Sequence, residues 1–489
     1  MLPTDDSLDT FVSLESQKTG VIEEPPFKIL MLGNWNGSAK SSSVADRQPI
    51  EIDRDDIDSV LRRLDARVVV PIGETTVELD FHSIDDLHPD EIFRRLPLFA
   101  ELRSLRKRLL DPNGFHAAAR EVRLWDDAPQ MQQRETPSTT APAADNLLDA
   151  ILAKPEGGAV PPKPKPSNDL GSLINELVRP HLIDLDENEQ AAMVAAVDKA
   201  TGNLMRSILN SQEFKELEAA WRGLYFLVNR TETSTERKIY ILDISKEELL
   251  DDVKSARDSA LAKILYDSND PWTAFFGNYT FAPSIEDVAA LIRIGKFAKD
   301  INAPFVAHIS AAVLGISSLA EQAEPSLWKV DQDSNEAKLW AALRGQAEAD
   351  YLAMTMPRLL ARLPYGRDTE PLESFDFEEF TDLPQHNDYL WMNGSFAAAL
   401  LLAQTHAEFG WGFAGRLLQD IERMPTHIYS NNGASIVVPA TEVQLSQSAA
   451  EELMERGLMP LVSFKNSDQV RLSSWQSIAE PLKMLKGNW

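Results

Sequence analysis

A proline-rich segment limits what this sequence can fold into. Eight prolines lie within residues 126–168, four of them within 161–166. Such a composition cannot bury enough apolar surface to offset the entropy of ordering, and closely spaced prolines favour extended, semi-rigid backbone. We therefore expect a linker at 126–168 that separates a first block at 27–125 from a second block at 169–489. Residues 1–26, which are acidic and end in two prolines, are expected to form a flexible tail.

Both blocks show patterns that are typical of α/β proteins. In the first block FKILMLG (27–33) is a short apolar run that ends at a glycine, which predicts a buried strand. The runs 66–72 and 75–81 predict a hairpin, and Pro97 is expected to separate two helices in the leucine-rich text that follows. In the second block helical and strand patterns alternate to the end. We predict two mixed α/β domains joined by a Pro-rich linker.

Two helical patterns stand out. The first runs over residues 214–228, and its apolar stripe consists of Phe214, Leu217, Trp221, Leu224, Tyr225 and Val228. We assign Trp221 to the core, because its helical face is apolar. The second pattern is DNLLDAIL (145–152) within the linker, with an apolar face made of Leu147, Leu148, Ile151 and Leu152. So short a helix is marginal alone, and we expect it to need a partner surface.

The composition excludes several classes of function. The net charge is −28, so phosphate backbones and anionic lipids would repel the chain, and we expect no nucleic-acid partner. No cysteine is present, which removes disulfides, thiolate nucleophiles and Cys-ligated metals. No apolar run is long enough to span a bilayer, and the acidic N-terminus is unlike a signal peptide. We therefore predict a cytoplasmic protein without membrane insertion.

The strongest enzyme signal is the loop at 33–41, because a phosphate-binding loop also follows a strand and ends in Lys-Ser. That motif requires glycines where this chain has Asn34 and Ala39, so we expect an ordinary solvent loop. The stretch from Asp331 resembles the start of a calcium loop, but Glu336 and Ala342 stand at two positions that the motif cannot lose. We predict no catalytic residues, no cofactor and no metal site.

The two blocks resemble the two sheath subunits of the bacterial type VI secretion system. The first block is similar to the small subunit between about residues 26 and 110, in the stretches PFKILMLGNWNG, DRQPIEIDRDDIDSVL and VELDFHSIDDLHPDEIFRRLPLFAELRSLRKRL. The second is more closely similar to the large subunit between about residues 168 and 477, in SQEFKELEAAWRGLYFLV, KIYILDISKEELLDD, APFVAHISAAVLG, MPRLLARLPYG, DYLWMNGSFAAAL and GLMPLVSFKNSDQ. Within these stretches we identify Trp221, Arg222 and Gly223 as a structural motif of the family.

The resemblance implies a mechanical role without an active site. In that family one small and one large subunit form a protomer, and stacked rings of protomers build a cytoplasmic tube around an inner tube. Contraction of the outer tube drives the inner tube through a target membrane. An AAA+ ATPase recycles contracted sheath by gripping an N-terminal helix of the large subunit. Residues 145–152 resemble that helix, which makes Leu147, Leu148, Ile151 and Leu152 candidate contacts for the ATPase.

Departures from the family pattern shape the functional prediction. Both subunit types occur in one chain, and the sequence ends at Trp489, where large subunits continue with a further domain that supplies a lattice arm. We therefore expect a sheath-like paralogue that joins or regulates sheath assembly. Its expected partners are other sheath subunits, with the recycling ATPase and baseplate or inner-tube proteins as further candidates. The alternatives are a complete fused protomer that polymerises on its own and, from a different class, an NTP-dependent enzyme that uses the loop at 33–41.

Overall fold

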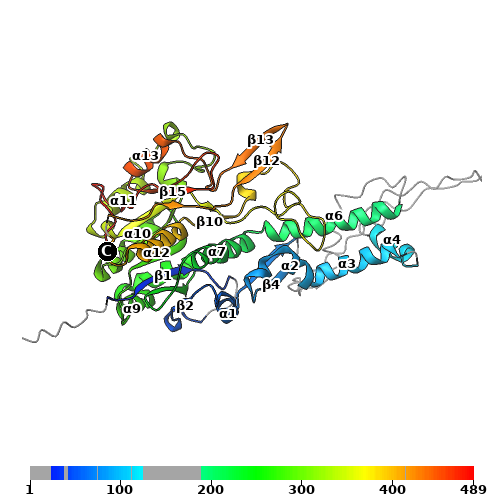
Figure 1. Cartoon of the computed structure of the whole chain (residues 1–489), viewed down its shortest axis with the longest axis horizontal. Helices are drawn as coiled ribbons and strands as arrows, with labels where there is room; N and C mark the ends of the chain where they lie inside the picture. Colours follow the sequence, from blue (N-terminus) through cyan, green and yellow to red (C-terminus); the bar gives the residue numbers. More distant parts are fainter. Residues whose placement is uncertain (1–23, 38–41, 74, 112, 125–188, 414) are drawn as a thin grey trace, which may run out of the picture.

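The computed structural model describes residues 24–37, 42–73, 75–111, 113–124, 189–413 and 415–489 (Figure 1). The predicted linker at 126–168 and almost all of the predicted tail at 1–26 lie outside these residues. The described part is built on one large mixed sheet with helices on both faces, as Figure 1 shows. The predicted α/β class is confirmed.

Among the described residues the large sheet has nine strands, and its six central strands are parallel. Their spatial order is β14-β8-β7-β6-β1-β5, with β15 and then β11 added antiparallel at one edge and β2 antiparallel at the other. The bounds in that order are β11 (Asp420–Ile421), β15 (Val470–Leu472), β14 (Met459–Ser463), β8 (Leu352–Met356), β7 (Phe305–Ile309), β6 (Ala274–Phe281), β1 (Phe27–Gly33), β5 (Arg237–Asp243) and β2 (Ile50–Ile52).

Strand β1 comes from the first block and lies between two strands of the second. All seven residues of FKILMLG are buried, as a parallel strand covered on both faces requires. Successive side chains of a strand point to opposite faces. Accordingly Phe27, Ile29 and Met31 belong to one apolar core, while Leu30 and Leu32 belong to the other.

Helices cover the two faces of the sheet. One core contains residues of α7 (Gln212–Asn229) and α12 (Ser395–Phe409). The helices that supply the second core are α8 (Lys246–Asp252), α9 (Ala260–Tyr266), α10 (Ile285–Ile301), α11 (Asn335–Arg344) and α13 (Gln447–Glu455). Within the described residues, no helix is long and apolar enough to cross a membrane.

The remaining elements extend from this body. The first block continues through α1 (Ile57–Arg63), the hairpin of β3 (Arg67–Ile72) and β4 (Thr75–Asp80), α2 (Pro89–Arg95), α3 (Pro97–Leu110) and α4 (Phe115–Arg123). Helices α3 and α4 pack on the long helix α6 (Glu189–Leu209) and form the elongated arm on the right of Figure 1. Two further antiparallel pairs are β9 (Leu359–Leu360) with β10 (Trp391–Met392), and β12 (His427–Asn431) with β13 (Ala434–Val438).

The sequence predicts individual helices and strands correctly, but not how the two blocks combine. The hairpin and the separation of α2 from α3 at Pro97 are confirmed. We predicted one domain on each side of the linker, but the sheet crosses that boundary, because β1 and β2 of the first block are strands of the same sheet as β5 and β6. The linker boundaries stay a prediction.

Candidate functional site

The two blocks meet first along strand β1, in a contact that we call the strand seam: β1 against β5 and β6, together with Trp35 and Trp221. The β1 residues pair in register with β5 from Phe27 opposite Arg237 to Gly33 opposite Asp243. Four of them also pair with β6. The first block thus supplies β5 with both of its neighbours, β1 and β2, and covers the edge of β6 that faces away from β7.

Two tryptophans close the end of the strand seam. The Trp35 indole N–H donates to the carbonyl of Leu242 at 3.1 Å, and the Trp221 indole N–H donates to the carbonyl of Trp35 at 2.9 Å. Their rings meet edge to face with centroids 6.0 Å apart, a favoured arrangement for aromatic pairs. Both side chains are fully buried, which confirms Trp221 as a core residue. Tyr225, which the sequence places in the same stripe, is instead 43% exposed.

Gly223 allows two helices to approach closely. A Cβ atom at this position would lie 2.3 to 2.8 Å from ring carbons of Phe396 on α12. That is far below van der Waals contact, so a side chain here would have to displace the buried Phe396 ring or move α7 away from α12. Glycine therefore suits the close packing of the two helices at this position.

Arg222 belongs to a buried ionic cluster made of Glu218, Arg222, Arg362, Tyr365 and Glu379. The Arg362 guanidinium lies 2.8 Å from carboxylate oxygens of both Glu218 and Glu379, and Arg222 donates to Glu218 at 2.7 Å. Burial disfavours ionisation, but the two arginines outweigh it and lower the pKa of Glu218. The cluster pairs two carboxylates with two guanidinium groups, which satisfies charges that would otherwise be costly in a core.

The blocks also meet along helices, in a contact that we call the helix seam: α2, α3 and α4 against α6 and the loop at 373–378. Its interior is apolar, because α3 and α6 bury side chains such as Leu105 and Leu204 in the same core, and polar contacts flank that core. The Asp90 carboxylate accepts the backbone N–H groups of Glu373 and Ser374, each at 3.0 Å. Burial alone would raise the pKa of Asp90, yet these hydrogen bonds lower it. Arg106 lies 2.6 Å from Asp198, and each side chain is nearly half exposed.

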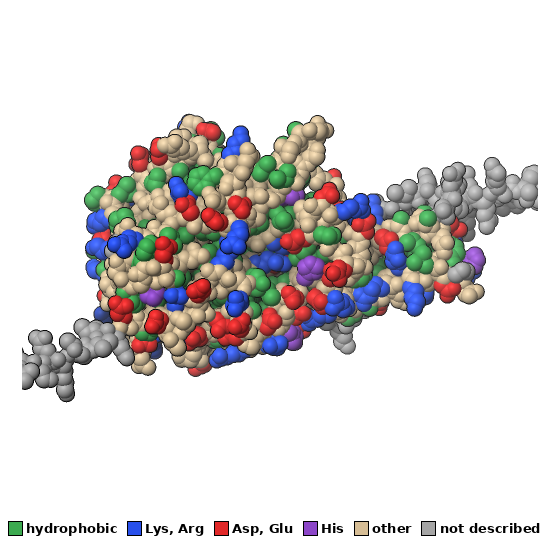
Figure 2. All heavy atoms as spheres, in the orientation of Figure 1, with side chains coloured by type: hydrophobic (Ala, Val, Ile, Leu, Met, Phe, Trp, Pro, Cys, Tyr) green, Lys and Arg blue, Asp and Glu red, His purple; other side chains and the backbone are tan. Residues whose placement is uncertain are grey.

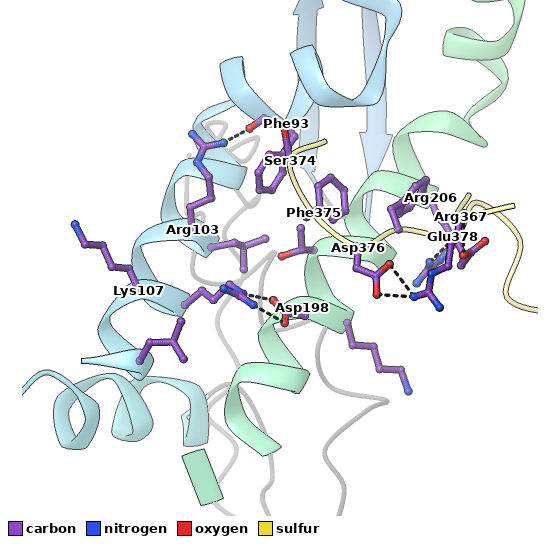
Figure 3. Close-up of a pocket in the computed structure, with 17 residues that line it drawn as sticks. Phe93, Arg103, Lys107, Asp198, Arg206, Arg367, Ser374, Phe375, Asp376 and Glu378 are labelled. Atoms are coloured by element: carbon purple, nitrogen blue, oxygen red, sulfur yellow. Dashed lines mark hydrogen bonds and ion pairs between the residues drawn. The ribbon is translucent and has the colours of Figure 1, made fainter. Parts of the chain in front are cut away.

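A groove of about 740 Å³ opens along the helix seam (Figure 3). Phe93 and Phe375 stack at its upper end with ring centroids 4.5 Å apart. Charged side chains of both signs line the groove together with these two rings, and the cationic ones are in excess. The cationic ones are Arg103, Arg106, Lys107, Lys199, Arg206 and Arg367, and the anionic ones are Asp198, Asp376 and Glu378. The groove is therefore locally cationic in a chain whose net charge is −28.

The loop after β1 is described as far as Gly37, and three of its backbone amides there are bonded within the protein. The backbone N–H groups of Trp35 and Asn36 donate to one carboxylate oxygen of Asp243, at 2.8 and 3.2 Å, and the N–H of Gly37 donates to the Asn34 side chain. A phosphate cradle needs such amides for its anion. Residues 38–41, with Ala39 and Lys40, lie outside the described part.

The other predicted sites can be placed as follows. Asp331 accepts the N–H of Asp333 in the turn that leads to Ser334, the N-cap of α11, so this stretch begins a helix. Among the residues that the structure describes, no three His, Asp or Glu side chains are grouped to hold a metal ion. The proposed ATPase contacts in 145–152 lie outside the described residues and stay a prediction.

One prominent element escaped the sequence analysis as a unit. No hairpin was predicted here from the sequence, but residues 427–431 pair with 434–438 in a projecting hairpin. The signal was present, because Asn432 and Gly433 both have positive φ, as a two-residue hairpin turn requires. An Asn-Gly pair between two apolar runs could have identified it.

These features describe an α/β protein in which a smaller and a larger block share one sheet, and comparison with known proteins identifies its family. Residues 191–479 match the family described as EvpB/VC_A0108, tail sheath N-terminal domain, and residues 12–120 match that described as type VI secretion system, VipA, VC_A0107 or Hcp2. The chain therefore belongs to the type VI secretion tail sheath family.

A curated relative supports the same assignment. The chain is 34% identical over 307 residues to the type VI secretion system sheath protein TssC1 of Pseudomonas aeruginosa PAO1. The match covers 59% of this chain and 61% of that protein. Both resemblances seen in the sequence, to a small and to a large sheath subunit, are thereby confirmed.

Proposed function

We propose that this chain is a non-enzymatic, cytoplasmic component of a type VI contractile sheath that enters the assembly as one preformed unit. The observation that carries the proposal is the position of β1. A strand from the small-subunit-like block lies between β5 and β6 of the large-subunit-like block, so that the two halves form one sheet. Such a body can bear a mechanical load along its backbone hydrogen bonds without any catalytic step.

Within that class, we propose a paralogue that joins or regulates sheath assembly. The net charge of −28 supports this role, since many like-charged copies packed side by side would repel one another. Separately encoded sheath subunits are the proposed partners. The recycling ATPase, through 145–152, and baseplate or inner-tube proteins are further candidates. A fused protomer that polymerises alone is the second candidate, and the shared sheet is compatible with it.

An NTP-dependent enzyme receives no support from the described residues. The amides of Trp35, Asn36 and Gly37 are already bonded within the protein. An ATPase and GTPase assay over a range of nucleotide concentrations should show no hydrolysis that depends on Lys40. An ATPase or GTPase activity that is present in the parent and lost in Lys40→Ala would reinstate the enzyme.

Assembly with purified partners tests the structural proposal. Tagged full-length protein should capture separately produced small or large sheath subunits, and by electron microscopy the isolated chain should form no tubes. Tubes formed by this chain alone would favour the fused protomer over the joining role. Failure to bind either subunit type, together with an absence of tubes, would reject both.

A further inference from the structure

The hairpin of β12 and β13 projects from the body at the top of Figure 1. Its base is held by the Tyr389 hydroxyl, which lies 2.8 Å from Nδ1 of the buried His427. Within the described residues neither strand pairs with a third. A two-stranded ribbon is marginally stable alone, so the exposed part of this hairpin would gain stability from a covering partner.

The hairpin has one face toward the protein and one toward solvent. Tyr429 and Ile436 are opposite each other on the inner face, and both are partly buried. On the outer face Ile428 is paired with Val437, and these side chains are 61% and 42% exposed. Residues directly opposite on antiparallel strands have adjacent side chains. The two therefore form one exposed β-branched patch on a face that is normally polar.

The hairpin also carries no charge. From Met424 to Thr441 the sequence contains no Asp, Glu, Lys or Arg, although 25% of the chain is charged. In Figure 2 the projection is tan and green, without the red and blue of the body below it. Exposed strands normally carry charges that prevent pairing with other chains, and this hairpin has none.

We infer that the outer face of this hairpin packs against the same face of a second copy of the chain. Two copies with a net charge of −28 repel each other, and the neutral hairpin is a surface through which they can approach without placing like charges in contact. The patch is complementary to itself, because Ile428 and Val437 can pack on their counterparts around a two-fold axis. An isologous contact of this kind closes at a dimer and does not propagate into a tube.

Light scattering on the full-length protein tests the inference. The mass should rise from 54.5 kDa toward twice that value with concentration. An Ile428→Lys/Val437→Lys variant would bring four ammonium groups together and should dimerise at least about 100-fold more weakly. Ile285→Lys is the matched control, since Ile285 is 66% exposed on α10, and it should dimerise like the parent.

A second measurement does not depend on disrupting the contact. The chain has no cysteine, so Ser430→Cys on the outer face introduces a single thiol in an otherwise thiol-free protein. Oxidation should produce disulfide-linked dimers, whereas Ser317→Cys, exposed elsewhere, should yield few. A parent that stays monomeric, or a lysine variant that dimerises normally, would overturn the inference. The inference would also be overturned if the parent were monomeric and the hairpin variants lost binding to a separately encoded sheath subunit. That result would still support the proposed sheath function.

Discussion

The strand seam and the helix seam join the same two blocks and both bury apolar side chains, but only the strand seam adds backbone pairing between strands. In the strand seam, apolar side chains are fully buried and β1 is bonded on both sides along its backbone. The helix seam also buries apolar side chains of α3 and α6, but its elements are helices and a loop without strand pairing, and partly exposed ion pairs such as Arg106 with Asp198 flank a groove at its surface. Apolar burial stabilises both seams, whereas the backbone pairing of β1 is added only in the strand seam, and exposed ion pairs contribute little. The blocks should therefore stay joined when the exposed ion pairs of the helix seam are lost.

Cleavage of the linker tests the strand seam with the largest expected effect. A specific protease site inserted after Gly158 should be cut without separating the halves, because β1 remains held between β5 and β6. The two fragments should co-elute from a sizing column in native buffer and separate in urea. Separation of the fragments in native buffer would mean that the blocks are independent after all.

Truncation of Trp221 should cause the next largest change. Trp221→Ala removes a fully buried ring and its hydrogen bond to Trp35, and we expect a loss of about 3–5 kcal/mol in the free energy of unfolding. Urea denaturation followed by circular dichroism measures it. Tyr225→Ala is the control one turn along the same helix, and it should be mild because Tyr225 is 43% exposed. Equal losses in the two variants would contradict the assignment of Trp221 to the seam.

Acid should weaken the helix seam through Asp90. Its folded pKa lies below the ordinary value of 3.8, despite burial, because backbone N–H groups stabilise the carboxylate. Its contribution is therefore present above about pH 4 and is lost as the pH falls through the folded pKa. Asp90→Asn should be less stable than the parent at pH 6, and the difference in urea midpoint should shrink toward pH 3. A difference that stays constant with pH would show that the charge of Asp90 is irrelevant.

The smallest effect is expected for the exposed ion pair. Arg106→Ala should reduce the free energy of unfolding by less than about 1 kcal/mol, because both partners are solvated. Added salt should reduce the difference further. The measurement is the urea midpoint at low and high ionic strength. A loss comparable to that of Trp221→Ala would show that this pair is not the minor surface contact that its exposure indicates.

Local patterns predicted the elements well but not their partners. FKILMLG is the buried strand that its apolar run indicates. Its neighbours could not be predicted, because pairing with β5 joins residues roughly 200 positions apart and leaves no local pattern. The proline-rich linker suggested two separate units, yet a linker determines only how the chain is connected. The sheet determines what folds together.

For the residues of the candidate site too, local burial could be predicted from the sequence, but contacts between distant residues could not. The burial of Trp221 was predictable from its helical face, but its bond to the Trp35 carbonyl depends on where β1 ends. The role of Gly223 in helix packing could not be predicted, because its neighbour Phe396 lies on a different helix, far away in the sequence. Aspartate is usually exposed at the surface, so the sequence gives no sign that Asp90 is buried. Only the fold brings its carboxylate to the backbone N–H groups of Glu373 and Ser374.

The insertion of β1 has a consequence for the stoichiometry of assembly. If the two blocks were separate chains, the completed sheet would depend on their concentrations, and dilution or unequal synthesis would leave β5 and β6 without their shared neighbour. In a single chain the strand is supplied at a fixed ratio of one to one, and its effective concentration is set by the linker. The large-subunit-like sheet can therefore be completed however few copies the cell makes, which suits a component that is needed in small numbers.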